Sequence, residues 1–144
     1  MENRYLYKAK TTPKEKEKGE FNNVWAIGNL IVSNGKYYIH PVGNIVKIRN
    51  EIGRIIVMHE VIPDTICQFT GLKDRNGKLI WENDIVVCRD FTEEKYVIAW
   101  KQDEACFEYQ QYGCSIMNFE QLSGCEIEVI GNIFDNKDLL ESEK

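Results

Sequence analysis

Residues 68–81 read QFTGLKDRNGKLIW and carry the clearest structural signal in the chain. Asn76-Gly77 stands between two β-prone arms, and this dipeptide accepts the positive φ angles that a tight hairpin turn requires. The stretch therefore predicts a compact antiparallel hairpin. Nearer the N-terminus, Asn34-Gly35 stands between two further β-prone segments and predicts a second hairpin.

Short or alternating apolar runs extend this pattern in both directions. Gly, Asn, Asp or Pro interrupts them about every 8–12 residues, which is typical of an all-β protein. Residues 115–122 fit either a short helix or a last strand, because so few residues leave the hydrophobic period undefined. Residues 136–144 predict one helical turn. The expected strands are residues 4–10, 24–32, 37–40, 45–48, 55–62, 84–89, 95–100, 106–109 and 127–134.

The chain has 144 residues, which is the length of one domain or of two small ones. Residues 1–66 carry 10 basic and 7 acidic side chains, whereas residues 67–144 carry 8 basic and 16 acidic ones, so the two halves have net charges of +3 and −8. We expect a small sheet or open barrel in the first half, and a compact SH3-like barrel with a short helical tail in the second. Halves of opposite charge could also attract each other between protomers.

No targeting or membrane segment is visible in the sequence. The N-terminus lacks the uninterrupted apolar stretch of about 7–15 residues that a secretory signal needs. A membrane helix needs about 20 apolar residues, and the longest apolar runs here have strand length. We therefore expect a cytoplasmic protein with no membrane partner. Residues 11–20 alternate in charge and predict an exposed loop.

Residue types that carry catalysis or bind metals are scarce. His40 and His59 are the two histidines, and neither lies near a cysteine in the sequence, so we expect no Cys–His nucleophile pair. Wide cysteine spacing without a Cys-x-x-C pair predicts reduced thiols that pack as small apolar groups. We accordingly expect no enzyme activity, no metal and no cofactor. The five cysteines are Cys67, Cys88, Cys106, Cys114 and Cys125.

The tip of the hairpin at residues 68–81 superficially fits the start of a calcium loop, with Asp74 and Asn76 at the first and third positions. Such a loop also needs an oxygen ligand at the fifth position and a bidentate acid at the twelfth. Lys78 and Ile85 occupy those positions, so the pattern predicts a turn instead of a calcium site.

The same hairpin offers a candidate surface for single-stranded nucleic acid. Lys73, Arg75 and Lys78 surround the turn, and Phe69 and Trp81 lie on its arms. Basic side chains beside aromatic rings can grip phosphates and stack on bases. The acidic charge of this half, and the net charge of −5 for the whole chain, favour the other interpretation, in which basic groups solvate the tip and the rings fill the core.

The hairpin and a later segment together resemble a known family. Residues 68–86, QFTGLKDRNGKLIWENDIV, closely resemble the signature QFTGLKDKNGKEIYEGDIV of YopX-type proteins of bacteriophages and prophages. Residues 128–136, EVIGNIFDN, are similar to the closing EVIGNIYEN of that family, while residues 6–10 and 25–30 fit its opening more loosely. Asn83 stands where the family usually has Gly, and Asn tolerates the left-handed conformation that a turn needs.

The resemblance implies a small, mostly β protein of a phage or prophage, with no catalytic residues to carry over. The motif residues have physical interpretations of their own. Gly71 and Asn76-Gly77 supply turn geometry, and Asp84 orders the turn before the next strand. Gly131 permits a bend or a close backbone approach late in a strand.

We therefore expect an accessory protein in the cytoplasm of the bacterial host that acts without catalysis, as a binding or oligomeric module. Exposed strand edges in small sheets invite pairing, which is the physical reason to expect a homo-oligomer, with a phage or host protein as a further partner. The alternative function is a small barrel that binds single-stranded nucleic acid through the hairpin around Lys73, Arg75 and Lys78.

Overall fold

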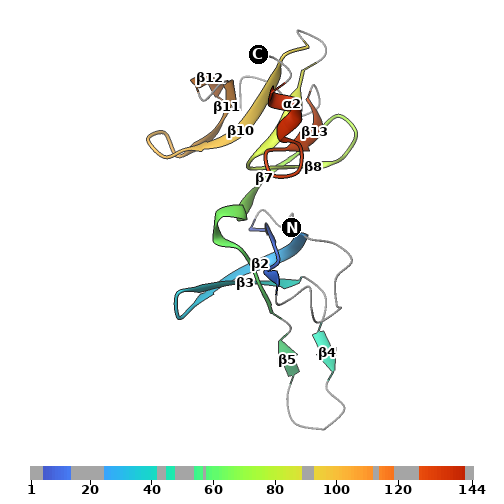
Figure 1. Cartoon of the computed structure of the whole chain (residues 1–144), viewed down its shortest axis with the longest axis vertical. Coiled ribbons are helices and arrows are strands. Elements are labelled where there is room, and N and C mark those ends of the chain that lie inside the picture. Colours follow the sequence, from blue (N-terminus) through green and yellow to red (C-terminus); the bar gives the residue numbers. More distant parts are fainter. Residues whose placement is uncertain are drawn as a thin grey trace. The chain divides into compact units, whose positions relative to one another are not determined.

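The protein is mainly β in its computed structural model, which describes residues 5–13, 25–41, 45–47, 54–56, 58–88, 93–111, 114–118 and 127–141 (Figure 1). The expected all-β class is confirmed. In these ranges, no helix is long and apolar enough to cross a membrane. The elements in chain order are β1 (Tyr7–Lys10), β2 (Trp25–Ser33), β3 (Lys36–Pro41), β4 (Ile45–Lys47), β5 (Arg54–Ile56), β6 (His59–Glu60), the 3-10 turn η1 (Pro63–Thr65), β7 (Cys67–Lys73), β8 (Leu79–Trp81), β9 (Asp84–Val87), β10 (Lys95–Lys101), β11 (Cys106–Gln111), β12 (Cys114–Asn118), β13 (Glu128–Asn132) and α2 (Lys137–Glu141).

The chain divides into two compact units, which we call the N-terminal unit, from Tyr5 to Gln68, and the C-terminal unit, built from Phe69 onward. Strand β7 contributes to both. Its residues Cys67 and Gln68 pair with β1, whereas Phe69 and Lys73 pair with Trp81 and Leu79 of β8. The sequence predicts a boundary between residues 66 and 67. That each unit is a subdomain of its own stays a prediction.

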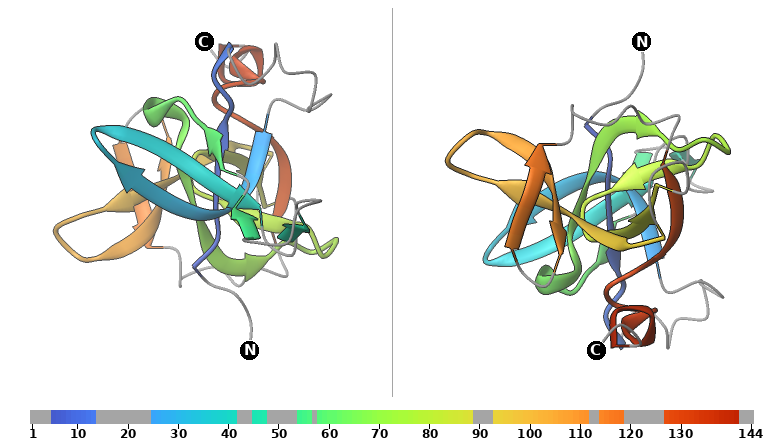
Figure 2. Two further views of the ribbon diagram at one scale, coloured as in Figure 1. Left: turned by 90° about the horizontal axis from the view of Figure 1, so that it is seen from below. Right: turned by 90° about the horizontal axis from the view of Figure 1, so that it is seen from above.

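The N-terminal unit is an antiparallel sheet in the order β6-β3-β2-β1-β7. Its centre is the β2–β3 hairpin, which Figure 2 shows as a long ribbon coloured blue to cyan. Ser33 pairs with Lys36 across the two-residue turn Asn34-Gly35. Both turn residues have a positive φ, 51° and 75°, which confirms the predicted tight hairpin. Strands β4 and β5 form a separate two-stranded ladder.

Close contacts between neighbouring segments hold the N-terminal unit together. A Cβ atom on Gly28 would overlap the carbonyl oxygen of His40 on β3, so only glycine fits there. The Thr65 hydroxyl accepts a hydrogen bond from the N–H of Lys10 at 2.9 Å and donates one to the carbonyl of Ile62 at 2.7 Å. The core of the unit contains Ala9, Ala26, Ile39 and Val61, with Tyr7, Leu30, Tyr37 and Ile66 packed against them.

The C-terminal unit contains an antiparallel sheet in the order β12-β11-β10-β9-β13, preceded by the β7–β8 hairpin. The rings of Tyr96 and Tyr109 meet edge to face in its core, with centroids 6.1 Å apart. Helix α2 follows β13, and the Nζ of Lys95 donates a hydrogen bond to the carbonyl of Leu139 at 3.1 Å. The core side chains are Ile80, Val86, Tyr96, Ile98, Tyr109, Ile127 and Val129, with Phe107 packed against them.

These bounds answer several questions that the sequence left open. At residues 115–122 the chain is a strand as far as Asn118, and the rest of that stretch lies outside the described residues. The apolar run at 55–62 is divided between β5 and β6. In the charged segment at 11–20, Thr11 bridges to Val61, and residues 14–20 lie outside the described part. Helix α2 confirms the single helical turn, while SH3-like closure stays a prediction.

Candidate functional site

The loop of the β7–β8 hairpin is longer than a two-residue turn. It closes with hydrogen bonds from the N–H of Asp74 to the carbonyl of Lys78 (2.7 Å) and from the N–H of Gly77 to the carbonyl of Asp74 (3.0 Å). Within this loop, Gly77 alone has a positive φ, 82°, so the geometry is that of a type I turn followed by a left-handed glycine. The predicted hairpin is present, but Asn76 does not adopt the left-handed conformation.

One buried carboxylate holds this loop to the last strand of the unit. Asp74 is 5% exposed, and its Oδ1 accepts hydrogen bonds from the N–H groups of Asn76 (2.8 Å) and Lys78 (2.9 Å). Its Oδ2 accepts a third, from the N–H of Val129 on β13, at 3.0 Å. Burial by itself would raise the pKa of Asp74, but the N–H donors of Val129, Lys78 and Asn76 and the charge of Lys78 lower that pKa below its ordinary value. Asp74 is thus an ionised clamp between the loop and β13.

Two backbone hydrogen bonds join the same two segments of sequence. The N–H of Arg75 donates to the carbonyl of Ile127 at 2.8 Å, and the N–H of Ile133 donates to the carbonyl of Asn83 at 3.1 Å. Asn83 has a φ of 70°, which confirms that asparagine takes the left-handed conformation at this turn. These hydrogen bonds therefore fix the positions of the two motif-bearing segments relative to each other, although the segments lie far apart in the sequence.

Three further motif residues have structural roles. Asp84 accepts a hydrogen bond from the N–H of Trp81 at 2.8 Å, so it orders the turn before β9 as predicted. Gly131 lies at an irregularity in β13, and a Cβ atom there would be 2.5 Å from the Oδ1 of Asn136, so of the two predicted roles the close approach is confirmed, with a side chain as the neighbour. Gly71 has a φ of 91° but lies at an irregularity within β7 instead of at a turn.

The five residues predicted to form a binding surface on the hairpin divide into two groups. Phe69 and Trp81 are both buried, with ring centroids 5.4 Å apart, so neither ring is available to stack on a base. Lys73, Arg75 and Lys78 are exposed around the loop. The structure thus brings the charges together at the surface and the aromatic rings together inside.

The comparisons with known proteins agree with these motifs. A family model described as YopX protein matches residues 2–141. The chain belongs to the YopX family. Among solved structures, it is similar to protein EF1440 from Enterococcus faecalis, with a TM-score of 0.53 and 20% sequence identity, over 94% of this chain and 96% of that one. This likeness shows a shared fold. No curated protein matches the chain in sequence.

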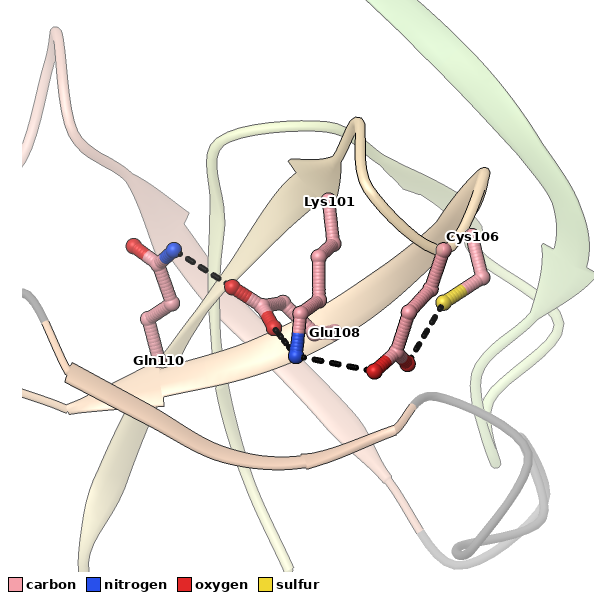
Figure 3. Close-up of polar contacts among 5 residues, drawn as sticks. Lys101, Cys106, Glu108 and Gln110 are labelled. Carbon is pink, nitrogen blue, oxygen red and sulfur yellow. Dashed lines mark hydrogen bonds and ion pairs between the residues drawn. The ribbon is translucent and has the colours of Figure 1, made fainter.

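The YopX chain also has a polar cluster on β10 and β11 that the sequence did not reveal (Figure 3). Glu108 is 3% exposed, and its carboxylate accepts a hydrogen bond from the Nε2 of Gln110 at 2.7 Å. The Nζ of Lys101 lies 3.9 Å from Glu108 and 3.2 Å from Glu104, and the hydrogen bond and charge of Glu104 raise the pKa of Lys101. The thiol of Cys106 lies 4.0 Å from Glu104. Alternation along β11 predicts that Glu108 faces away from the core, but no sequence signal predicts its burial.

Next to this cluster, an exposed tryptophan is held in a fixed position. Trp100 is 39% exposed, and its ring meets that of Phe107 edge to face at 5.1 Å. Its Nε1 donates a hydrogen bond to the Oε1 of Gln102 at 2.8 Å. Phe107 itself packs against the core, so the Trp100 ring is held by Phe107 on one side and by Gln102 at its Nε1.

The N-terminal unit of the YopX chain has its own surface cluster, on the face of β1 and β2 opposite Ala9 and Ala26. The ammonium groups of Lys8 and Lys10 lie 4.6 Å and 5.5 Å from the ring centroid of Trp25, which is cation–π geometry. Ile27, which pairs with Lys8, is 47% exposed. Over the described ranges, no group of three or more His, Cys, Asp or Glu side chains is placed to hold a metal ion.

Proposed function

We propose that this YopX protein is a non-enzymatic interaction module of a phage or prophage that assembles with copies of itself. The main support is that each unit presents a large apolar side chain at its surface beside charged groups: Ile27 in the N-terminal unit and Trp100 in the C-terminal unit. Aromatic and aliphatic side chains within a charged surround are typical of protein interfaces. Membership of the YopX family supports the phage or prophage origin.

The surroundings of the thiols support a role without catalysis. Cys67 and Cys88 are buried, and a nucleophilic cysteine needs access to a substrate. Cys106 is half-buried, and its thiol lies 4.0 Å from the carboxylate of Glu104. His59 is buried as well. The burial of these groups limits their access to a substrate and supports the proposed role without catalysis.

The contacts of β13 support the proposal that the C-terminal unit closes as a small SH3-like barrel. One edge of β13 pairs with β9. Hydrogen bonds from Val129 to the Asp74 carboxylate and from Arg75 to Ile127 join this part of the chain to the β7–β8 loop as well. A strand that is bonded at both edges is what closure of a sheet requires.

Nucleic-acid binding through the β7–β8 hairpin is the weaker alternative. Lys73, Arg75 and Lys78 are exposed and can attract phosphates, but binding of single strands gains much of its energy from bases that stack on exposed rings. The rings of Phe69 and Trp81 are buried. We therefore propose that the partner is a protein.

Size-exclusion chromatography with light scattering tests self-assembly on the full chain over a wide range of protein concentration. We expect a mass above that of the monomer, which falls as the protein is diluted. A single species with the monomer mass at every concentration would overturn the proposed self-assembly.

A further inference from the structure

We propose that Asn34 is a site of spontaneous deamidation, and that the Asp74 clamp protects the second Asn-Gly pair of the chain, at Asn76, from the same reaction. Asn-Gly is the sequence in which this reaction is least hindered, because glycine has no Cβ atom to obstruct the approach of its nitrogen. This chemistry goes beyond the proposed function, since it depends on two hairpin turns and not on a surface that binds a partner.

The reaction needs only the two residues of the turn and water. The backbone nitrogen of Gly35 attacks Cγ of the Asn34 side chain, so that a new N–Cγ bond forms and the Cγ–Nδ2 bond breaks. The Nδ2 group leaves as ammonia and takes the proton that the Gly35 nitrogen gives up. Water then opens the resulting succinimide at either of its carbonyl carbons, which gives aspartate or isoaspartate without oxidation or reduction.

The turn at Asn34 leaves both reacting groups accessible. Asn34 and Gly35 are exposed. Among the described residues, none accepts a hydrogen bond from the Gly35 N–H, and none holds the side-chain amide of Asn34. Attack requires rotation of the Asn34 backbone, and this rotation disturbs only the end of the β2–β3 ladder, where Ser33 pairs with Lys36. The barrier from the fold is therefore local.

The turn at Asn76 contains the same dipeptide and is also exposed, so access of water does not distinguish the two turns. Their hydrogen bonds do. The N–H of Gly77 donates to the carbonyl of Asp74 at 3.0 Å, and the N–H of Asn76 donates to the Asp74 carboxylate at 2.8 Å. That carboxylate also accepts the N–H of Val129 at 3.0 Å. Rotation at Asn76 therefore requires the opening of a loop that is bonded to β13.

Isoaspartate should disturb the N-terminal unit more than aspartate does. Both products place a negative charge at the turn, but isoaspartate also adds a carbon atom to the main chain between Ser33 and Lys36. The length of a hairpin turn sets the register of its strands. The β2–β3 hairpin contributes Leu30 and Ile39 to the core of the unit, so a longer turn should weaken this packing.

Peptide mapping by mass spectrometry tests the proposal on the full chain, incubated in mildly alkaline buffer and sampled over time. Asn34 should deamidate at least about tenfold faster than Asn76, because opening of the clamped loop breaks at least one hydrogen bond to a charged group. The matched control is Asn29, which is exposed on β2 but precedes Leu30, and it should react more slowly than Asn34. Equal rates at Asn34 and Asn76, or a faster reaction at Asn76 or Asn29, would overturn the proposal.

Asp74→Ala tests the protection of the second turn. Without the carboxylate, the rate at Asn76 should rise at least about tenfold, while the rate at Asn34 stays that of the wild type. An unchanged rate at Asn76 would overturn the protective role of the clamp. A rise of the same size at Asn34 would overturn the proposal as well, because the folded turn at Asn34 would then be as protective as the clamped loop.

Limited proteolysis measures the consequence for the N-terminal unit. The isoaspartate form, separated by chromatography from aged protein, should be cleaved in this unit several times faster than fresh protein. Asn34→Asp carries the charge without the extra main-chain carbon, and aspartate tolerates the left-handed conformation of the turn, so this variant should be cleaved at the rate of fresh protein. Equal cleavage of all three would overturn the expected loss of packing.

Discussion

The chain contains the same dipeptide, Asn-Gly, at the tips of two hairpins, and the two copies fold differently. Asn34 and Gly35 both have a positive φ and join β2 to β3 with no further residue in the turn. At the second tip, Gly77 has a positive φ, whereas Asn76 does not, and the loop extends from Asp74 to Lys78. The first turn is exposed, while the second is bonded to a distant strand.

The difference lies outside the dipeptide. Asp74 stands two residues before the second Asn-Gly, and its buried carboxylate accepts N–H groups from the loop and from β13. Ser33 stands directly before the first Asn-Gly and pairs with Lys36 as a regular position of the β2–β3 ladder. The conformation of a hairpin turn thus depends on the tertiary hydrogen bonds of neighbouring residues as much as on the φ preferences of its own residues.

Of the changes to the two hairpin turns, removal of the Asp74 carboxylate should have the largest effect on the free energy of unfolding. Asp74→Ala leaves the N–H groups of Asn76, Lys78 and Val129 without their acceptor, and we expect the free energy of unfolding to fall by about 3 kcal/mol. In the other turn, Asn34→Ala places alanine in the left-handed region and should cost about 1 kcal/mol. Urea unfolding measures both. Equal losses would show that the carboxylate has no special role.

A conservative variant tests the two carboxylate oxygens separately. Asp74→Asn keeps an oxygen for the loop donors, which both bind Oδ1, but turns an amide N–H₂ toward the N–H of Val129. Its loss of stability should be about 2 kcal/mol, between those of the wild type and Asp74→Ala. A loss as large as that of Asp74→Ala would mean that the loop bonds contribute little.

Acid should reduce the difference between the wild type and Asp74→Asn. The pKa of Asp74 is lower in the folded chain than its ordinary value of 3.8, so the ionised carboxylate stabilises the fold fully above that pH. The stabilisation is lost as the pH falls below 3.8 through the folded pKa. Urea unfolding from neutral pH down to this range measures the convergence. The cost of Asn34→Ala should stay constant over it, since neither residue titrates.

The smallest expected effect comes from placing glycine at each asparagine. Asn34→Gly should be neutral or stabilising by up to about 0.5 kcal/mol, because Asn34 has a φ of 51° and glycine adopts that conformation freely. Asn76→Gly should destabilise by about 0.5–1 kcal/mol, because φ is not positive there and glycine only adds freedom to the unfolded chain. Thermal unfolding compares the two. Effects of the same sign would contradict the different conformations.

Much of the fold was predictable because it depends on local chemistry. Asn34-Gly35 requires no distant partner, and the tolerance of Asn83 for a positive φ is a property of asparagine itself. The division of the run at 55–62 was not predictable, because His59 and Glu60 pair with β3 and the apolar pattern carries no information on that pairing.

The candidate site was less predictable, because burial depends on residues far away in the sequence. Lys73, Arg75 and Lys78 surround the loop as expected, yet the rings of Phe69 and Trp81 face each other inside. The sequence around Asp74 superficially fits a calcium loop and predicts a turn. Nothing in it indicates the hydrogen bond that the Asp74 carboxylate accepts from the N–H of Val129. The grouping of Lys8 and Lys10 around Trp25 likewise depends on the register of β1 against β2.

The clamp between Asp74 and Val129 also sets an order of events during synthesis. The two residues are 55 positions apart, so at about 5–20 residues per second Val129 is added roughly 3 to 11 s after Asp74. In that interval the β7–β8 loop has no β13 to bind, while all residues of the N-terminal unit have already been made. The C-terminal unit can therefore complete its fold only after Val129 has been made, and a nascent chain that ends before this residue leaves the loop without its partner strand.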